Sequence, residues 1–321
     1  MQMQNRIEAI DQYRGIAIIL MVIANYLFDV TTIPGWLKHA PDIGLTVIDL
    51  IAPFFIFAIG LTYGASYRAR VERDGTGRTW GHFLRRWLAL IGIGAIISAG
   101  EVLVGKNASP ISWGVLQAIG VAGIVTLLVI RVPPLWRALI ALVMLAAYQL
   151  LLDNLWLSTV LHSEHGGIEG AIAWSAMLIL SSVVADVWRK NGSNELGVAW
   201  PSAVALAAGL LLSLVAPISK NRVSASYVLV SLGASGLLFA VVQLVAGRLR
   251  FRPAYLRWWG INPLLLYVMH YLLLALVVLP DAPWWHVQAS IPLVVTQAAG
   301  IIAILSVAAW LLSRRKQPFS L

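Results

Sequence analysis

The chain has 321 residues, of which 60% are hydrophobic and only 12% are charged, and its mean hydropathy is +0.82. Soluble domains carry about 25% charged residues, so this composition excludes an ordinary soluble protein and predicts a polytopic membrane protein. The chain contains no cysteine, which excludes disulfides, thiolate metal sites and a cysteine nucleophile.

Ten segments are long and apolar enough to be membrane-spanning helices, which need about 20 mostly apolar residues. They are expected near residues 13–30, 45–67, 86–104, 113–131, 134–152, 169–188, 200–216, 224–247, 261–280 and 291–313. The first follows a short polar segment that lacks a small-residue cleavage site, so we interpret it as an uncleaved span and not as a signal peptide. Little chain remains outside the spans, so residues 1–321 are expected to form a single all-α transmembrane domain.

The basic residues divide unevenly between the two sides of the membrane. With the N-terminus inside, 19 of the 23 Lys and Arg residues lie on the inner side. The four outer ones are Lys38, Lys106, Lys220 and Arg222. The positive-inside rule therefore predicts that both termini are cytoplasmic. The net charge of +9 then reflects topology, and nucleic-acid binding is not expected because no soluble basic surface is evident.

The outer side carries the residues best suited to chemistry. The segment between the first two spans holds His39, with Asn25 and Asp49 near the adjoining helix ends. A strongly polar side chain at membrane depth is costly unless it is partnered, which makes function the default hypothesis. His39 can act as base and acid near neutral pH, Asp49 can hold the imidazole in one tautomer, and Asn25 can donate to an oxyanion. The alternatives are a loop-capping role for His39 and interhelical hydrogen bonds for the other two.

Other polar residues lie near the inner side or within a span. Asp11 and Arg14 are three residues apart at the start of the first span, which favours an ion pair on one helix face; alternatively, Arg14 contacts a phosphate. In the ninth span, Asn262 and His270 are eight residues apart, or about 80° around a helix, so both can face one cavity.

Two outer segments carry further candidates. The loop PISKNR contains Lys220 and Arg222, which either form a solvated corner or grip an anionic acceptor. The segment HSEHGGIEG contains His162, Glu164 and His165. Its His-x-x-His spacing in a glycine-rich loop is weak evidence for a metal, and no metal is expected.

Several segments together resemble a known family. In chain order they include DQYRGIAIILMVIANY, WLKHAPDIGLTVIDLIAPFFIFAIG, PISKNRVSASYVLVSLG and INPLLLYVMHYLL. They resemble the catalytic domain of heparan-α-glucosaminide N-acetyltransferase and its bacterial relatives, which belong to the wider group of transmembrane acyltransferases. The resemblance covers nearly the whole chain.

The resemblance implies an enzyme that takes an acetyl group from cytosolic acetyl-CoA and acetylates an amino sugar of the glucosamine type across the membrane. It places the family's catalytic histidine on His39, a functional asparagine on Asn25 and the late-helix histidine on His270. The large luminal domain of the animal enzyme is missing, which suggests a minimal prokaryotic form in the bacterial cytoplasmic (inner) membrane. A homodimer is expected only by analogy with the family.

The resemblance and the charge distribution together give the expected binding residues. Because CoA is anionic and cytosolic, the donor is expected to contact Arg14, Arg85, Arg86, Asn262 and His270. The acceptor glycan or amino sugar is expected at Lys220 and Asp42.

The sequence also departs from the family pattern at two places. Asp42 and Ile43 stand where the family often has a tryptophan and an asparagine, and Arg222 and Val223 stand where an aromatic residue is usual. Both departures fall where an acceptor would bind.

Several readings stay open. His39 can serve as a general base or can carry the acetyl group itself. An O-acyltransferase for cell-envelope glycans would share His39 and the donor. A proton-coupled transporter also needs polar residues at membrane depth, but the sequence shows no inverted repeat. A non-catalytic membrane subunit should tolerate loss of His39.

Overall fold

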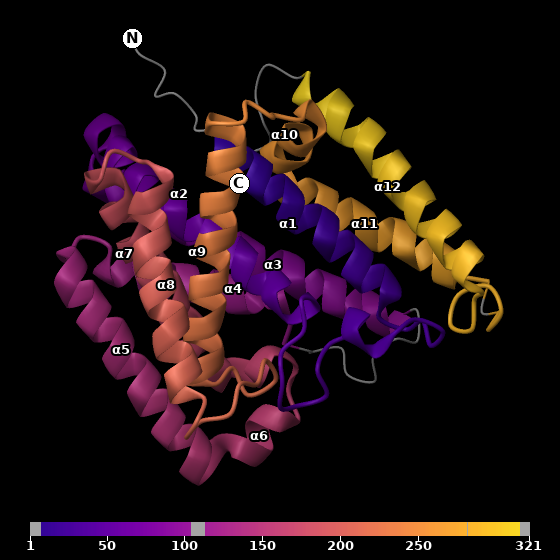
Figure 1. The fold of residues 1–321 in the computed structure, drawn as a ribbon, viewed down its shortest axis with the longest axis horizontal. Coiled ribbons are helices and arrows are strands. Elements are labelled where there is room, and N and C mark those ends of the chain that lie inside the picture. The colour runs from indigo at the N-terminus through magenta and orange to yellow at the C-terminus, as the bar shows by residue number, and fades with distance from the viewer. Residues whose placement is uncertain (1–7, 104–112, 281, 315–321) are drawn as a thin grey trace. The chain divides into compact units, whose positions relative to one another are not determined.

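A computed structural model describes residues 8–103, 113–280 and 282–314, and these residues form helices and loops without a strand (Figure 1). Among them, eight single helices are long and apolar enough to cross a membrane, and one bent pair of helices gives up to nine spans. The chain is therefore an all-α polytopic membrane protein, as its composition predicts.

About ten spans are predicted from the sequence and the described residues give eight to nine candidates, and every predicted span overlaps a helix. The first helix begins at Glu8, five residues earlier than expected. The helix of the second span begins at Ile51, because residues 45–50 form a loop and a 3₁₀ turn. The helix Val115–Val129 has only 15 residues. Hydropathy gives the length of an apolar stretch but does not show where the backbone turns within it.

The ninth predicted span, residues 261–280, corresponds to one helix, but a short helix that the prediction did not include precedes it at a sharp bend. Helix α10 (Ala254–Ile261) and helix α11 (Pro263–Val278) are bent by 88° at Asn262. Proline disfavours a helical conformation in the residue before it, and Asn262, which precedes Pro263, has φ −129° and ψ 57°. Asn262 therefore lies at the bend, as the N-cap residue of the helix that carries His270.

The helices form two compact units. The first comprises residues 1–39, 46–51 and 241–320. Within it, α1 (Glu8–Leu27) packs against α10, α11 and α12 (Ile291–Ser313). Figure 1 shows α1 and α11 side by side.

Two glycines bring α1 and α10 into backbone contact. A Cβ atom on Gly15 would lie 2.0 Å from the Leu256 carbonyl oxygen, and one on Gly260 would lie 1.8 Å from the Asp11 carbonyl oxygen. Small residues at helix crossings allow this close approach in membrane proteins.

The second unit comprises residues 40–45 and 52–240. Its helices are α2 (Ile51–Asp74), α3 (Thr76–Leu103), α4 (Val115–Val129), α5 (Pro134–Leu151), α6 (Leu157–Leu161), α7 (Gly167–Lys190), α8 (Glu195–Leu212) and α9 (Ala225–Gly247), which runs past residue 240. A π-helical turn, Leu152–Trp156, joins α5 to α6.

Helix α7 is the core of the second unit. It packs against α4, α5 and α8, and Trp174, Met177 and Trp188 on it are almost fully buried. A helix that is apolar on all sides is typically enclosed by other helices. By contrast, Leu139, Val143 and other large apolar side chains on α5 are exposed, as expected for a surface that faces lipid.

Candidate active site

The segment between α1 and α2 brings His39 into contact with Asp49. His39 follows the short 3₁₀ turn Gly35–Leu37, and Asp49 lies in a second turn, Ile48–Leu50. The atoms His39 Nδ1 and Asp49 Oδ1 are 2.7 Å apart. The Asp49 side chain is fully buried, whereas 29% of the His39 side chain is exposed. The hydrogen bond expected between these two residues is therefore present.

The Asp49 carboxylate is held in place by its own loop. Its Oδ2 atom accepts hydrogen bonds from the Thr46 backbone N–H at 2.8 Å and from Thr46 Oγ1 at 3.0 Å. Both bonds come from a residue three positions earlier in the same loop. Sequence reasoning missed Thr46, although the spacing Thr-x-x-Asp is a signal that could have indicated it.

This geometry sets the tautomer of His39. An ionised carboxylate only accepts hydrogen bonds, so the neutral imidazole carries its proton on Nδ1 and donates it to Asp49. The Nε2 atom then has a free lone pair with which to take a proton or attack a carbonyl carbon. The Phe28 ring lies edge-on to the imidazole, with 6.3 Å between ring centroids.

A second histidine is joined to Asn25. The Asn25 Nδ2 and His270 Nε2 atoms are 2.9 Å apart, and His270 Nδ1 contacts the Tyr267 carbonyl oxygen. His270 is 2% exposed and contacts the rings of Tyr267 and Tyr271 at centroid distances of 5.1 and 4.4 Å. A carbonyl only accepts, so Nδ1 carries the proton and Nε2 accepts from the asparagine amide. Sequence reasoning missed Tyr267, because a backbone carbonyl leaves no mark in the residue pattern.

Asp42 forms an ion pair with Arg222. Arg222 Nε lies 2.9 and 3.1 Å from the two Asp42 carboxylate oxygens, and Arg222 Nη2 contacts Oδ2 as well. Ser219 Oγ donates to Asp42 Oδ1 at 2.9 Å. The hydrogen bond from Arg222 holds the pKa of Asp42 below its usual value. Arg222 thus grips an anion of its own chain, a partner that the sequence analysis did not foresee.

Two further bonds attach the residues around Asp42 to the loop before α9. The side-chain amide of Asn221 donates to the Pro41 carbonyl at 2.6 Å, and the Gly44 N–H donates to the Ile218 carbonyl at 2.8 Å. Lys220, which lies in this loop, is half-buried. Asp42 and Lys220, the two residues expected to bind an acceptor, therefore lie in two segments that hydrogen bonds hold together.

No metal site accompanies these groups in the part of the chain that the structure describes. Within residues 8–103, 113–280 and 282–314, no three His, Asp or Glu side chains gather closely enough to hold a metal ion.

Comparison with known proteins shows the family of this chain. Residues 6–212 match the family described as heparan-alpha-glucosaminide N-acetyltransferase, catalytic. The chain belongs to this family. It is 34% identical over 128 residues to heparan-alpha-glucosaminide N-acetyltransferase of Mus musculus and 37% identical over 127 residues to that of Homo sapiens. Each match covers 36% of this chain and 18% of the relative, so the chain matches less than a fifth of the length of these curated proteins.

The matched range of the N-acetyltransferase family includes one of the three polar pairs completely and one residue of each of the other two. His39 and Asp49 both fall within residues 6–212, as does Asn25, whereas its partner His270 lies beyond them. Asp42 is likewise inside the range and its partner Arg222 is outside it.

The arginines expected to bind the donor are each engaged within the chain. Arg14 lies 3.9 Å from Asp11, the i,i+3 pair that its spacing favours. Arg85 Nε donates to the Gly81 carbonyl at 3.2 Å, and the Arg86 guanidinium lies 5.1 Å from the centroid of the Trp87 ring. Their role toward a donor stays a prediction.

Asn262 lies at the start of the ninth predicted span, as expected. It is 3% exposed at the break between α10 and α11, whereas His270 lies on α11 and contacts Asn25. Asn262 is the N-cap residue of the helix that carries His270. The role of these two residues toward a donor stays a prediction.

Proposed function

We propose that this chain is a membrane acetyltransferase that moves an acetyl group from acetyl-CoA to the amino group of a glucosamine-type sugar. The observation that carries the proposal is the 2.7 Å contact between half-exposed His39 and buried Asp49. It lies inside the range that matches the N-acetyltransferase family. A histidine oriented by a buried carboxylate is the arrangement that activates nucleophiles in acyl transfer.

His39 Nε2 supplies the base. The amine nitrogen of the acceptor attacks the thioester carbonyl carbon, and His39 accepts the proton that this nitrogen loses. When the tetrahedral intermediate collapses, the carbon–sulfur bond breaks and the proton passes to the departing CoA thiolate. In the alternative course, His39 Nε2 attacks the thioester first and the CoA thiolate departs. The amine then attacks the acetyl group, the bond to Nε2 breaks, and the amine proton neutralises the thiolate.

Asn25 supplies a donor to the oxyanion. Its side-chain amide has two N–H bonds, and one of them is directed at His270 Nε2. The second N–H is the group assigned to the oxyanion of the intermediate. His270 then acts as a positioning residue that holds the asparagine amide.

Donor and acceptor approach from opposite sides of the membrane. Nineteen of the 23 Lys and Arg residues fall on the predicted cytoplasmic side, where acetyl-CoA is found, so the acceptor meets His39 on the outer side. Asp42 and Lys220 are assigned to the acceptor, with the Asp42–Arg222 pair shaping the loop that receives it. We assign the protein to the bacterial cytoplasmic membrane.

The test is transfer of radiolabelled acetyl from acetyl-CoA to glucosamine by the purified full-length protein, with His39→Ala as the variant. We expect transfer by the wild type and a loss of about 1,000-fold or more in the variant. Thermal unfolding of both proteins checks that the variant is folded. Equal transfer by both proteins would remove His39 from the mechanism.

Matched acceptors decide between nitrogen and oxygen as the acetylated atom. Glucose has a hydroxyl where glucosamine has an amine, so an N-acetyltransferase should label glucosamine alone. Equal labelling of both sugars would support the O-acyltransferase. No labelling of either sugar and no binding of acetyl-CoA would favour a transporter.

A further inference from the structure

A cavity of about 480 Å³ lies within the second unit. It is bounded by the C-terminal half of α2, the loop between α4 and α5, the start of α5 and the last turns of α7. Its polar lining includes the guanidinium groups of Arg68, Arg131 and Arg137 and the carboxylates of Glu72 and Asp186. Three cations thus face two anions.

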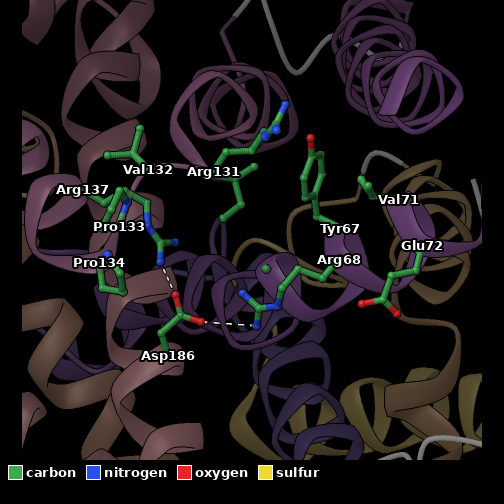
Figure 2. Close-up of a pocket in the computed structure, with 12 residues that line it drawn as sticks. Tyr67, Arg68, Val71, Glu72, Arg131, Val132, Pro133, Pro134, Arg137 and Asp186 are labelled. Carbon is green, nitrogen blue, oxygen red and sulfur yellow. Dashed lines mark hydrogen bonds and ion pairs between the residues drawn. The ribbon is translucent and has the colours of Figure 1, made fainter. Parts of the chain in front are cut away.

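Arg137 is built into the wall of this cavity. Its side chain is 2% exposed, and its guanidinium donates to Ser182 Oγ at 2.8 Å and to the Asp186 carboxylate. Figure 2 shows this carboxylate between Arg137 and Arg68, and Arg68 Nη2 lies 3.4 Å from it. One carboxylate therefore serves two arginines, so their combined charge is only partly balanced.

Two buried donors of the cavity have no hydrogen-bond partner within the described residues. They are Arg137 Nε and the Tyr67 hydroxyl. A buried donor without a partner is costly, and a bound ligand with acceptor oxygens would satisfy it. Arg131 is the third arginine of the lining, and its side chain is exposed.

We propose that this cavity binds a phosphate group. Phosphate oxygens match the planar donor pattern of guanidinium groups, and several arginines around one cavity neutralise its charge. The cavity lies at the end of the second unit that the positive-inside rule assigns to the cytoplasm. A soluble nucleotide such as CoA and the headgroup of an anionic phospholipid both present phosphate there. For a phospholipid headgroup the proposal is independent of acetyl transfer, whereas for CoA it rests on the proposed function.

The test uses the full-length protein and the variant Arg131→Gln. This arginine is exposed and lines the cavity, so its removal should leave the fold intact, whereas loss of Arg137 would leave Asp186 with one partner fewer. Arg78→Gln is the matched control, because Arg78 is an exposed arginine of the second unit that does not line the cavity. One arm measures binding of radiolabelled CoA beside pantetheine, which lacks phosphate. The other titrates phosphatidylglycerol in mixed micelles and counts bound lipid by native mass spectrometry.

We expect Arg131→Gln to weaken binding of a phosphate-bearing ligand by about fivefold or more, which is typical of a charge-assisted contact. Arg78→Gln and the binding of pantetheine should change by less than about twofold, as expected of a surface charge. Loss of CoA binding alone identifies the nucleotide as the source, and loss of lipid binding alone identifies the phospholipid. Equal effects of both variants on both ligands, or no binding of either ligand by the wild type, would overturn the proposal.

Discussion

A histidine is a useful base only if its proton sits on the right nitrogen, and in this chain the neighbour that decides this is Asp49. The carboxylate is buried and is fixed on its other oxygen by Thr46. It therefore cannot turn away from His39 without losing two hydrogen bonds. The orientation of the imidazole is set before any substrate arrives, which is the condition for effective general base catalysis.

Replacement of Asp49 by asparagine should preserve the shape of this site and remove its charge. An amide can donate to His39 Nδ1 and thereby stabilise the wrong tautomer, so we expect the kcat for acetyl transfer to fall by about 100-fold or more. The KM for acetyl-CoA should stay within about threefold. Thr46→Val is the control, because it removes one hydrogen bond and keeps the charge, and it should cost less than about tenfold. Equal losses in both variants would contradict the tautomer argument.

Asp42 and Arg222 should be coupled energetically. Their side chains are 33% and 19% exposed, so a double-mutant cycle of Asp42→Asn and Arg222→Gln should give a coupling of about 1 kcal/mol. Because the pKa of Asp42 is lowered in the folded protein, the pair stabilises the fold above the usual carboxyl pKa. This stabilisation is lost only as the pH falls through the lowered value. Thermal unfolding at pH 7 measures the cycle, and additive effects would refute the coupling.

Some side-chain contacts could be predicted from the sequence and others could not. The contact between His39 and Asp49 follows from their chemistry and their closeness in the chain, so it was foreseeable. The contacts of Asn25 with His270 and of Asp42 with Arg222 join residues 245 and 180 positions apart. A single sequence does not show which distant residues are in contact. It showed that Asp42 and Arg222 both differ from the family pattern, but not that they bind each other.

At the scale of the helices, the crossing of α1 and α10 depends on two glycines. Hydropathy indicates that both segments are helical but says nothing of how closely they approach. The atoms that a Cβ would meet at Gly15 and Gly260 belong to the backbone of the facing helix. Backbone atoms cannot rotate away as a side chain can, so the helices themselves would have to move apart.

Gly15→Ala should therefore destabilise the protein by about 1–3 kcal/mol, the usual cost of overpacking. Gly300→Ala is the matched control, because Gly300 lies in a helix of the same unit and an added Cβ would meet nothing within 4 Å. That variant should be as stable as the wild type or slightly more so, since alanine favours the helix. Thermal unfolding in detergent measures both. Equal melting temperatures for the two variants would show that α1 and α10 can separate at no cost.

The break between α10 and α11 marks the limit of span prediction. The predicted span begins at residue 261, so it leaves out the short helix α10 and the 88° bend at Asn262. Pro263 was a visible signal, since proline favours a helix start and disfavours a helical residue before it. A hydropathy profile does not take account of proline. It could therefore predict that a helix is present but not that the chain bends before it.

At the scale of the whole molecule, the arrangement of charge predicts how the chain crosses the membrane. The inner segments hold 19 of the 23 basic residues, and the positive-inside rule acts on such short loops. The His39 segment is then outside, and the turn between α2 and α3 is inside. Both the proposed direction of acetyl transfer and the proposed phosphate cavity depend on this orientation.

The absence of cysteine from the chain makes the orientation directly measurable with single introduced thiols. Gly35 and Gly77 are both exposed, and a Cβ on either would meet nothing within 4 Å, so cysteine at either position should be tolerated. In intact bacterial cells, a membrane-impermeant maleimide should label Gly35→Cys and spare Gly77→Cys until the membrane is permeabilised. Wild-type protein controls for labelling of other groups. The reverse pattern would place His39 on the cytoplasmic side, together with acetyl-CoA, and would end the case for transfer across the membrane.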